Sequence, residues 1–129
     1  MTLRCVIVDD SPAFVAAARS LLERQGVTVL GTAATGAEAV RLAADLHPDV
    51  MLVDIDLGPE SGFDLARRLA ESAAPPVILI STYAEEDYAD LIAGSPALGF
   101  IPKATLSAAA ISGMLDGAAS PGVSETPGT

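Results

Sequence analysis

The chain has 129 residues, half of them hydrophobic, and a formal net charge of -10. This length allows one domain with a well-buried core, and the apolar content argues against a disordered chain. The seven basic residues are scattered, and only Lys103 lies beyond Arg68, which argues against direct binding of nucleic acid because phosphate backbones require clustered positive charge.

The N-terminal sequence and the cysteine content bear on the compartment. Cys5 is the single cysteine, so the chain has no disulfide framework, and we expect a reducing, cytoplasmic setting. The apolar run at 3–8 follows the start directly and is too short for the apolar region of a signal peptide or for a membrane span. We therefore expect no association with a membrane.

Short apolar runs alternate with segments of helical period, which predicts repeated βα units on a parallel sheet. The boundaries come from Ser11 and Pro12 at the first helix start, a capping box that begins at Thr35, and prolines that stop later helices. In chain order we predict strand 3–8, helix 12–25, strand 27–31, helix 36–46, strand 50–53, helix 61–73, strand 77–80, helix 85–93, strand 99–102 and helix 106–115.

Five strands that alternate with five helices predict an α/β fold, a doubly wound five-stranded parallel sheet with right-handed crossovers. The flavodoxin-like strand order 2-1-3-4-5 fits best, with its crevice between strands one and three. We expect one domain over residues 1–117. Residues 118–129 are rich in Ala, Ser, Pro, Gly and Thr and predict a flexible C-terminal tail.

Polar side chains follow four of these strands. Asp9 and Asp10 follow the first strand, Asp54 the third and Ser81 the fourth, while Lys103 follows the fifth. In the order 2-1-3-4-5 these strand ends are contiguous, at the edge where α/β folds bind ligands. The strand order and the site therefore support each other.

The chemistry of this set favours a divalent metal and a phosphoryl group. Two carboxylates about 4 Å apart repel by roughly 4 kcal/mol at an effective dielectric near 20, so clustered acids take up protons or share a cation. A few hard oxygen ligands suit Mg²⁺, which readily shares a phosphate oxygen. Phosphoryl transfer requires mainly positioning and charge neutralisation, and Asp54, central in the row, suits the role of nucleophile through an acyl phosphate.

At this point the chain resembles the bacterial two-component response-regulator receiver domain, the CheY-like family, over about residues 3–116. The match rests on Asp9-Asp10, Asp54, Ser81, Phe100 and Lys103 at these spacings. The resemblance implies that Asp54 takes a phosphoryl group from a phosphohistidine. It also implies that Asp9, Asp10, Asp54 and the backbone carbonyl of Asp56 serve Mg²⁺, and that Ser81 and Lys103 contact the phosphoryl oxygens.

The resemblance further implies a switch and two positions that tune it. Ser81 and Phe100 would move on activation, Phe100 by swinging inward, and Asp56 and Tyr83 occupy positions that tune the phosphate lifetime. The chain departs from the family at Gly58-Pro59, which reverses the usual order, and at Ala104, where a cis proline is usual. A cis bond before a residue other than proline costs about 3 kcal/mol, so we expect a trans Lys103–Ala104 bond.

The expected partners are a sensor histidine kinase or phosphotransfer protein and an unknown downstream protein. The downstream protein would be reached through the face formed by helix 85–93, strand 99–102 and helix 106–115. We expect no output domain in this chain, and we expect a regulator that catalyses only its own phosphorylation and dephosphorylation. The fifth helix has no charge at 107–115, so charge-paired dimerisation is not expected there, and we expect a monomer or weak dimer.

Two alternatives remain at the level of sequence. Asp54-Ile55-Asp56, Ser81 and Lys103 also look like the motifs of haloacid-dehalogenase-type phosphohydrolases, although that family places its Asp-x-Asp on the first strand. A receiver-like binding module that never takes phosphate is the other alternative. A dinucleotide-binding domain is disfavoured because the turn after strand one is acidic and lacks the Gly-rich fingerprint.

Overall fold

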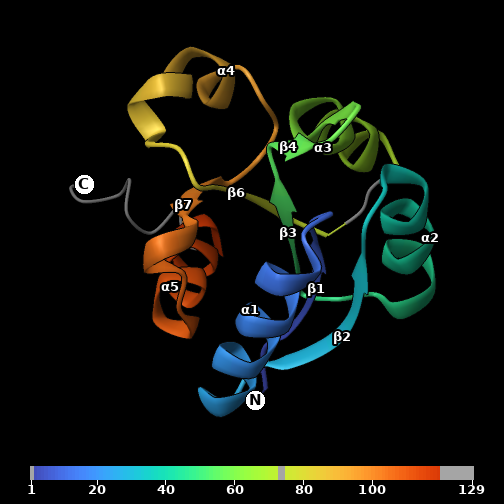
Figure 1. Cartoon of the computed structure of the whole chain (residues 1–129), viewed down its shortest axis with the longest axis vertical. Coiled ribbons are helices and arrows are strands. Elements are labelled where there is room, and N and C mark those ends of the chain that lie inside the picture. Colours follow the sequence, from blue (N-terminus) through green and yellow to red (C-terminus); the bar gives the residue numbers. More distant parts are fainter. Residues whose placement is uncertain (1, 73–74, 120–129) are drawn as a thin grey trace.

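The computed structural model describes residues 2–72 and 75–119 (Figure 1). Its main sheet has five parallel strands in the order β2-β1-β3-β6-β7, which confirms the predicted order 2-1-3-4-5. The labels differ because a small hairpin intervenes in the chain. The strands are β1 (Arg4–Val8), β2 (Thr28–Ala33), β3 (Val50–Asp54), β6 (Val77–Ser81) and β7 (Gly99–Pro102).

Helices cover both faces of the sheet (Figure 1). On one face, α1 (Pro12–Arg24) and α5 (Ala108–Ala119) pack over a cluster that includes Cys5, Ile7 and Leu52. On the other face, α2 (Gly36–Leu46) and α3 (Gly62–Glu71) pack over a cluster that includes Val6 and Val53. Since both faces are covered, the central strands are apolar throughout, as their sequences predict.

Local signals in the sequence place the helix ends. The Ser11 hydroxyl accepts from the N–H of Phe14 at the start of α1, and the Thr35 hydroxyl accepts from the N–H of Glu38 at the start of α2. His47 ends α2 with a left-handed φ of 48°. Pro48 follows directly and prevents the helix from continuing.

The predicted helix 85–93 forms as two short pieces. Glu85–Tyr88 is a 3-10 turn, η1, and α4 covers only Ala89–Ala93. Neither piece contains a fully buried residue, although Tyr88 and Ile92 rest partly buried on the core beside α3. The prediction of a single continuous helix was therefore wrong, because this segment lacks the apolar stripe that would hold a full helix on the sheet.

A hairpin that the sequence did not predict follows β3. It pairs β4 (Asp56–Leu57) with β5 (Glu60–Ser61), and Gly58 turns between them with φ of +73°. The hairpin ends at the N-terminus of α3, so that helix begins at residue 62 rather than 61. The expected end of this helix at residue 73 lies outside the described residues.

The C-terminal part also differs in its boundaries. Lys103–Thr105 forms a short 3-10 turn, η2, so α5 begins at Ala108 rather than at residue 106. It runs to Ala119, two residues past the expected domain boundary, and residues 120–129 of the expected tail lie outside the described residues. Every described peptide bond is trans, including Lys103–Ala104 as expected. Within the described ranges, no helix is long and apolar enough to cross a membrane.

Candidate functional site

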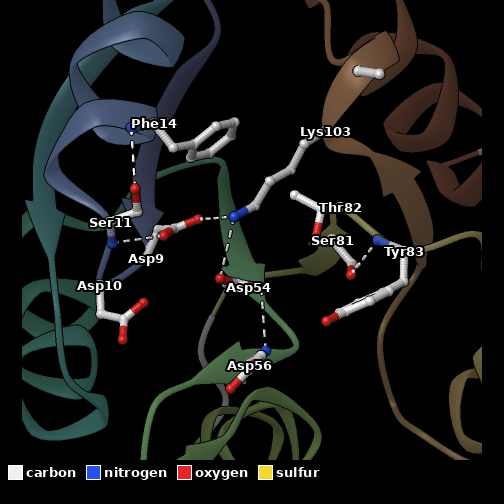
Figure 2. Close-up of a pocket in the computed structure, with 11 residues that line it drawn as sticks. Asp9, Asp10, Ser11, Phe14, Asp54, Asp56, Ser81, Thr82, Tyr83 and Lys103 are labelled. Carbon is white, nitrogen blue, oxygen red and sulfur yellow. Dashed lines mark hydrogen bonds and ion pairs between the residues drawn. The ribbon is translucent and has the colours of Figure 1, made fainter.

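The carboxyl ends of the strands surround an open pocket of about 570 Å³ (Figure 2). Several strands contribute side chains to it, as the contiguous strand ends predict. Of the residues proposed from the sequence, the pocket wall includes Asp9, Asp10, Asp54, Asp56, Ser81, Tyr83 and Lys103.

Asp54 is the central carboxylate and is only 6% exposed. Its Oδ1 accepts from the backbone N–H of Asp56 at 3.1 Å, and its Oδ2 lies 3.2 Å from Nζ of Lys103. The pKa of Asp54 is raised to about 6, mainly because the side chain is buried. The negative charge of Asp9 also raises this pKa, whereas the hydrogen bond from the N–H of Asp56 and the positive charge of Lys103 lower it. The carboxylate is thus ionised at neutral pH but poorly solvated, which suits a nucleophile.

Lys103 reaches from the end of β7 across the pocket to two acids (Figure 2). Its Nζ lies 2.7 Å from Oδ2 of Asp9 and 4.3 Å from the centre of the Phe14 ring. Burial opposes the charge on Lys103, but the contacts with Asp9 and Asp54 outweigh burial and raise its pKa above the ordinary value. The ammonium is therefore charged at neutral pH and held at the acids.

Asp9 and Asp10 complete the acidic cluster. The Asp9 side chain is fully buried, and its Oδ1 accepts from the N–H of Ser11 at 2.9 Å. Among the described residues, its Oδ2 has no partner beyond the ion pair with Lys103, although Asp9 lines the pocket. Asp10 is exposed. Figure 2 shows its carboxylate apart from the Lys103 contact.

These acids fit a divalent cation. One carboxylate oxygen from each of Asp9, Asp10 and Asp54 lies within 4.8 Å of the other two. The donors are all hard oxygens, which Mg²⁺ prefers. Within the described part of the chain, Asp9 Oδ2 is buried and contacts the ammonium of Lys103 alone, so added positive charge beside it would be favourable.

Ser81 and Tyr83 form the opposite wall. The Ser81 hydroxyl is buried and accepts from the N–H of Tyr83 at 3.0 Å. The Tyr83 side chain is 53% exposed, and its ring centre lies 6.0 Å from that of Tyr88, which in turn lies 6.2 Å from Phe63 of α3. A row of aromatic rings therefore runs from the pocket to the segment that contains α4.

Phe100 is the predicted site residue that does not line the pocket. It is 4% exposed and belongs to the core cluster beside α2 and α3. The ring is thus already inside in this structure, and its role in a switch stays a prediction.

Glycines let the backbone approach Asp54 closely. A Cβ at position 62 would lie 2.1 Å from the carbonyl oxygen of Asp54, so no other residue fits there without moving the acceptor's backbone. A Cβ at Gly58 would lie 3.1 Å from Asp10, and its φ of +73° favours glycine as well. The reversed Gly58-Pro59 order therefore still supplies a left-handed residue to the loop.

The sequence analysis missed two residues that make contacts in or beside the site. Phe14 was not singled out as a site residue, but its ring covers the ammonium of Lys103. Glu60 was not singled out, yet its carboxylate accepts from the N–H of Gly36 at 2.9 Å and ties the hairpin to α2. No periodic pattern in the sequence predicts either contact. The one weak indication is that Glu60 is an acidic residue in the loop that follows Asp54.

Comparison with known proteins identifies the family. The model of the response regulator receiver domain matches residues 5–113. A protein-glutamate methylesterase/protein-glutamine glutaminase of Alkalilimnicola ehrlichii is 39% identical over 108 residues, which is 80% of this chain and 27% of that protein. Protein PilH of Pseudomonas aeruginosa is 41% identical over 86 residues, which is 64% of this chain and 70% of that protein.

Similar solved structures belong to the same family as the similar sequences. A two-component response regulator of the LuxR family from Aurantimonas superimposes with a TM-score of 0.80 at 28% identity, over 91% of this chain and 87% of that one. The chain spans about a quarter of the length of the methylesterases that it matches, with 23% and 27% for two of them. The fold, the acidic pocket and the family match together show that this chain belongs to the response regulator receiver domain family.

Proposed function

We propose that this chain is a phosphoacceptor switch in which Asp54 accepts a phosphoryl group from the phosphohistidine of a sensor kinase or phosphotransfer protein. Receiver domains are phosphoacceptor signalling regulators rather than conventional enzymes, and they interact with such partners. The observation that carries the assignment to Asp54 is its place beside the ammonium of Lys103 and the acids Asp9 and Asp10, where it is ionised but poorly solvated.

The proposed reaction uses the carboxylate as nucleophile. An Asp54 oxygen forms a bond to phosphorus, the phosphorus–nitrogen bond breaks, and its electron pair stays on the imidazole of the donor. Lys103 releases the carboxylates and binds a phosphoryl oxygen, because its permanent charge offsets the negative charge brought by the group. The Ser81 hydroxyl, now accepting from Tyr83, binds a second oxygen.

Asp9, Asp10, Asp54 and the backbone carbonyl of Asp56 would hold Mg²⁺ in this proposal. When bound, the ion supplies positive charge against the carboxylates and the phosphoryl group. The close grouping of three carboxylate oxygens and the otherwise unpartnered oxygen of Asp9 support this choice. The family match supports it as well, because receiver domains bind Mg²⁺ in an acidic pocket.

The output would act through η1–α4, β7 and α5 on a downstream protein. The row of rings Tyr83, Tyr88 and Phe63 supports this route, because it joins the pocket wall to η1 and α3. Asp56 and Tyr83, both in the pocket wall, would tune the lifetime of the phosphoryl group. Phosphorylation would act as a local change of charge that biases this segment between two arrangements.

Intact mass spectrometry after incubation with acetyl phosphate and Mg²⁺ tests the proposal. We expect one labile phosphoryl adduct, absent in Asp54→Asn and absent when the metal is chelated. Asp64→Asn, an exposed acid of α3 outside the pocket, is the matched control and should keep the adduct.

The other outcomes separate the alternatives. No adduct together with no binding of beryllofluoride would contradict the switch and favour a phosphorylation-independent binding module. Steady release of phosphate without an adduct would be compared across a panel of phosphate esters. Turnover of an ester that is lost in Asp56→Asn would favour the hydrolase alternative, whereas the carboxylate of Asp56 in this structure accepts from the N–H of Gly58 in its own loop.

A further inference from the structure

The carboxylate of Glu60 joins the β4–β5 hairpin to α2. Oε1 of Glu60 accepts from the backbone N–H of Gly36 at 2.9 Å, across 24 positions of the chain. Gly36 is the first residue of α2, where the N–H groups have no partner within the helix and the helix dipole favours negative charge. The contact is therefore favourable both as a hydrogen bond and as a charge interaction.

The site on α2 is shaped to admit this side chain. Gly36 is buried, and a Cβ there would lie 2.7 Å from Oε2 of Glu60 and 3.2 Å from an Nη atom of Arg68. A side chain at position 36 would displace the carboxylate. A glycine at this position thus permits an approach that a helix-forming residue would block.

Helix α2 has other caps besides this contact. The Thr35 hydroxyl accepts from the N–H of Glu38, and the Glu38 carboxylate accepts from the N–H of Ala34 at 3.0 Å. Each hairpin strand is only two residues long, and such a short pair is marginal by itself. Leu57, buried at 2% exposure, anchors the first strand. At the base of the hairpin the N–H of Gly62 donates to the carbonyl of Ile55 at 2.9 Å, and near its tip Glu60 supplies the contact with α2.

The hairpin matters because it carries Asp56. The N–H of Asp56 holds Oδ1 of Asp54 at 3.1 Å, and Asp56 pairs with Ser61, the neighbour of Glu60, in the hairpin ladder. A shift of the hairpin would move this N–H and the backbone carbonyl of Asp56 together. Residues that hold metal ligands in place commonly change metal affinity by about 10- to 100-fold when they are removed.

We propose that Glu60 is a positioning residue: by binding the N-terminus of α2, it fixes the hairpin and so holds Asp56 in place beside Asp54. The metal-binding part of this proposal rests on the proposed function, in which the carbonyl of Asp56 is a ligand of Mg²⁺. The anchoring part does not, because it concerns the hairpin in the metal-free protein.

Two readouts on Glu60→Ala test the proposal. By calorimetric titration we expect Mg²⁺ affinity to fall about tenfold, at the lower end of the usual range because the contact is only partly buried. By NMR hydrogen exchange in metal-free protein, we expect the Asp56 amide to exchange several-fold faster. Glu60→Gln keeps an oxygen acceptor at this position and should restore most of both values.

Glu38→Ala is the matched control. It removes the same charge and another acceptor at the N-terminus of α2, but Glu38 does not reach the hairpin. It should leave both readouts near the wild-type values while its effect on the melting temperature resembles that of Glu60→Ala.

The remaining outcomes are distinct. Unchanged exchange and affinity in Glu60→Ala would overturn the proposal. Equal losses of affinity in Glu60→Ala, Glu60→Gln and Glu38→Ala would also overturn it, since charge alone would then account for the effect. If the wild-type protein binds no Mg²⁺, the proposed function fails, and the Asp56 exchange rate alone decides whether Glu60 anchors the hairpin.

Discussion

Lys103 places its ammonium nitrogen 2.7 Å from Oδ2 of Asp9, so the ends of β7 and β1 are joined across the two strands that separate them. The lysine side chain is 12% exposed and the aspartate side chain is fully buried. In the metal-free protein the lysine is therefore the cation that offsets the acidic cluster. A metal ion bound by the same acids would offset part of their negative charge in place of the lysine.

Lys103→Met should lower the stability of the metal-free protein at pH 7.5 by about 3 kcal/mol, the usual cost of removing one partner from a buried ion pair. Saturating Mg²⁺ should raise the melting temperature of this variant by more than it raises that of the wild type. Arg67→Met is the control, because its ion pair with Asp64 is more than half exposed and should matter little. An equal gain from Mg²⁺ in all three proteins would contradict this account.

Asp54 should make stability depend on pH. Its pKa is about 6 in the folded protein against an ordinary 3.8, so between these values the folded state retains a proton that the unfolded state has lost. The free energy of unfolding should therefore fall as the pH rises through this window, by about 3 kcal/mol in total, and then level off.

Thermal unfolding in chelator, from pH 4 to 7.5, checks this dependence. Asp54→Asn should lose this component of the slope and should be more stable than the wild type at pH 7.5 but not at pH 4. A wild-type slope that persists in the variant would place the titrating group elsewhere.

Gly62→Ala should be strongly destabilising. The new Cβ would meet the carbonyl oxygen of Asp54 and the backbone of Ile55, neither of which can rotate away. We expect a loss of at least about 3 kcal/mol in urea unfolding, as for other severe steric changes in a core. Gly113→Ala in α5 meets nothing within 4 Å and should instead add about 0.5–1 kcal/mol through helix propensity.

Phe14→Leu should slow phosphorylation by acetyl phosphate about threefold. The ring face lies 4.3 Å from Nζ of Lys103, and a contact of this kind contributes about 0.5–1 kcal/mol to holding the cation. Phe14→Tyr retains the ring and should retain the rate, while both variants should fold. Equal rates in Phe14→Leu and the wild type would show that Asp9 and Asp54 hold the lysine without help from the ring.

The arrangement of the site could be predicted from the sequence because it follows from topology. Each of Asp9, Asp54 and Ser81 comes at the end of an apolar strand, and parallel strands bring such ends to one edge. The strand order then followed from the requirement that these strand ends lie next to one another. The chain's single lysine at the end of β7 completed the set.

The hairpin and its anchor could not be predicted in the same way. Asp56–Ser61 is too short to show a period of two, and the contact of Glu60 with Gly36 joins residues with no shared pattern. The division of η1 and α4 was also missed. Glu85-Glu86-Asp87 favours a helix start, but it brings no apolar side chain to fix the helix on the sheet.

The thin attachment of η1–α4 has an energetic consequence. The segment rests on the core through the partly buried Tyr88 and Ile92, so an alternative position would expose little apolar surface. A difference of 1.4 kcal/mol changes the ratio of two populations tenfold, which is comparable with one charged hydrogen bond. In the proposed switch, one phosphoryl group at the pocket end of the row of rings would therefore supply enough free energy to redistribute this segment between two arrangements.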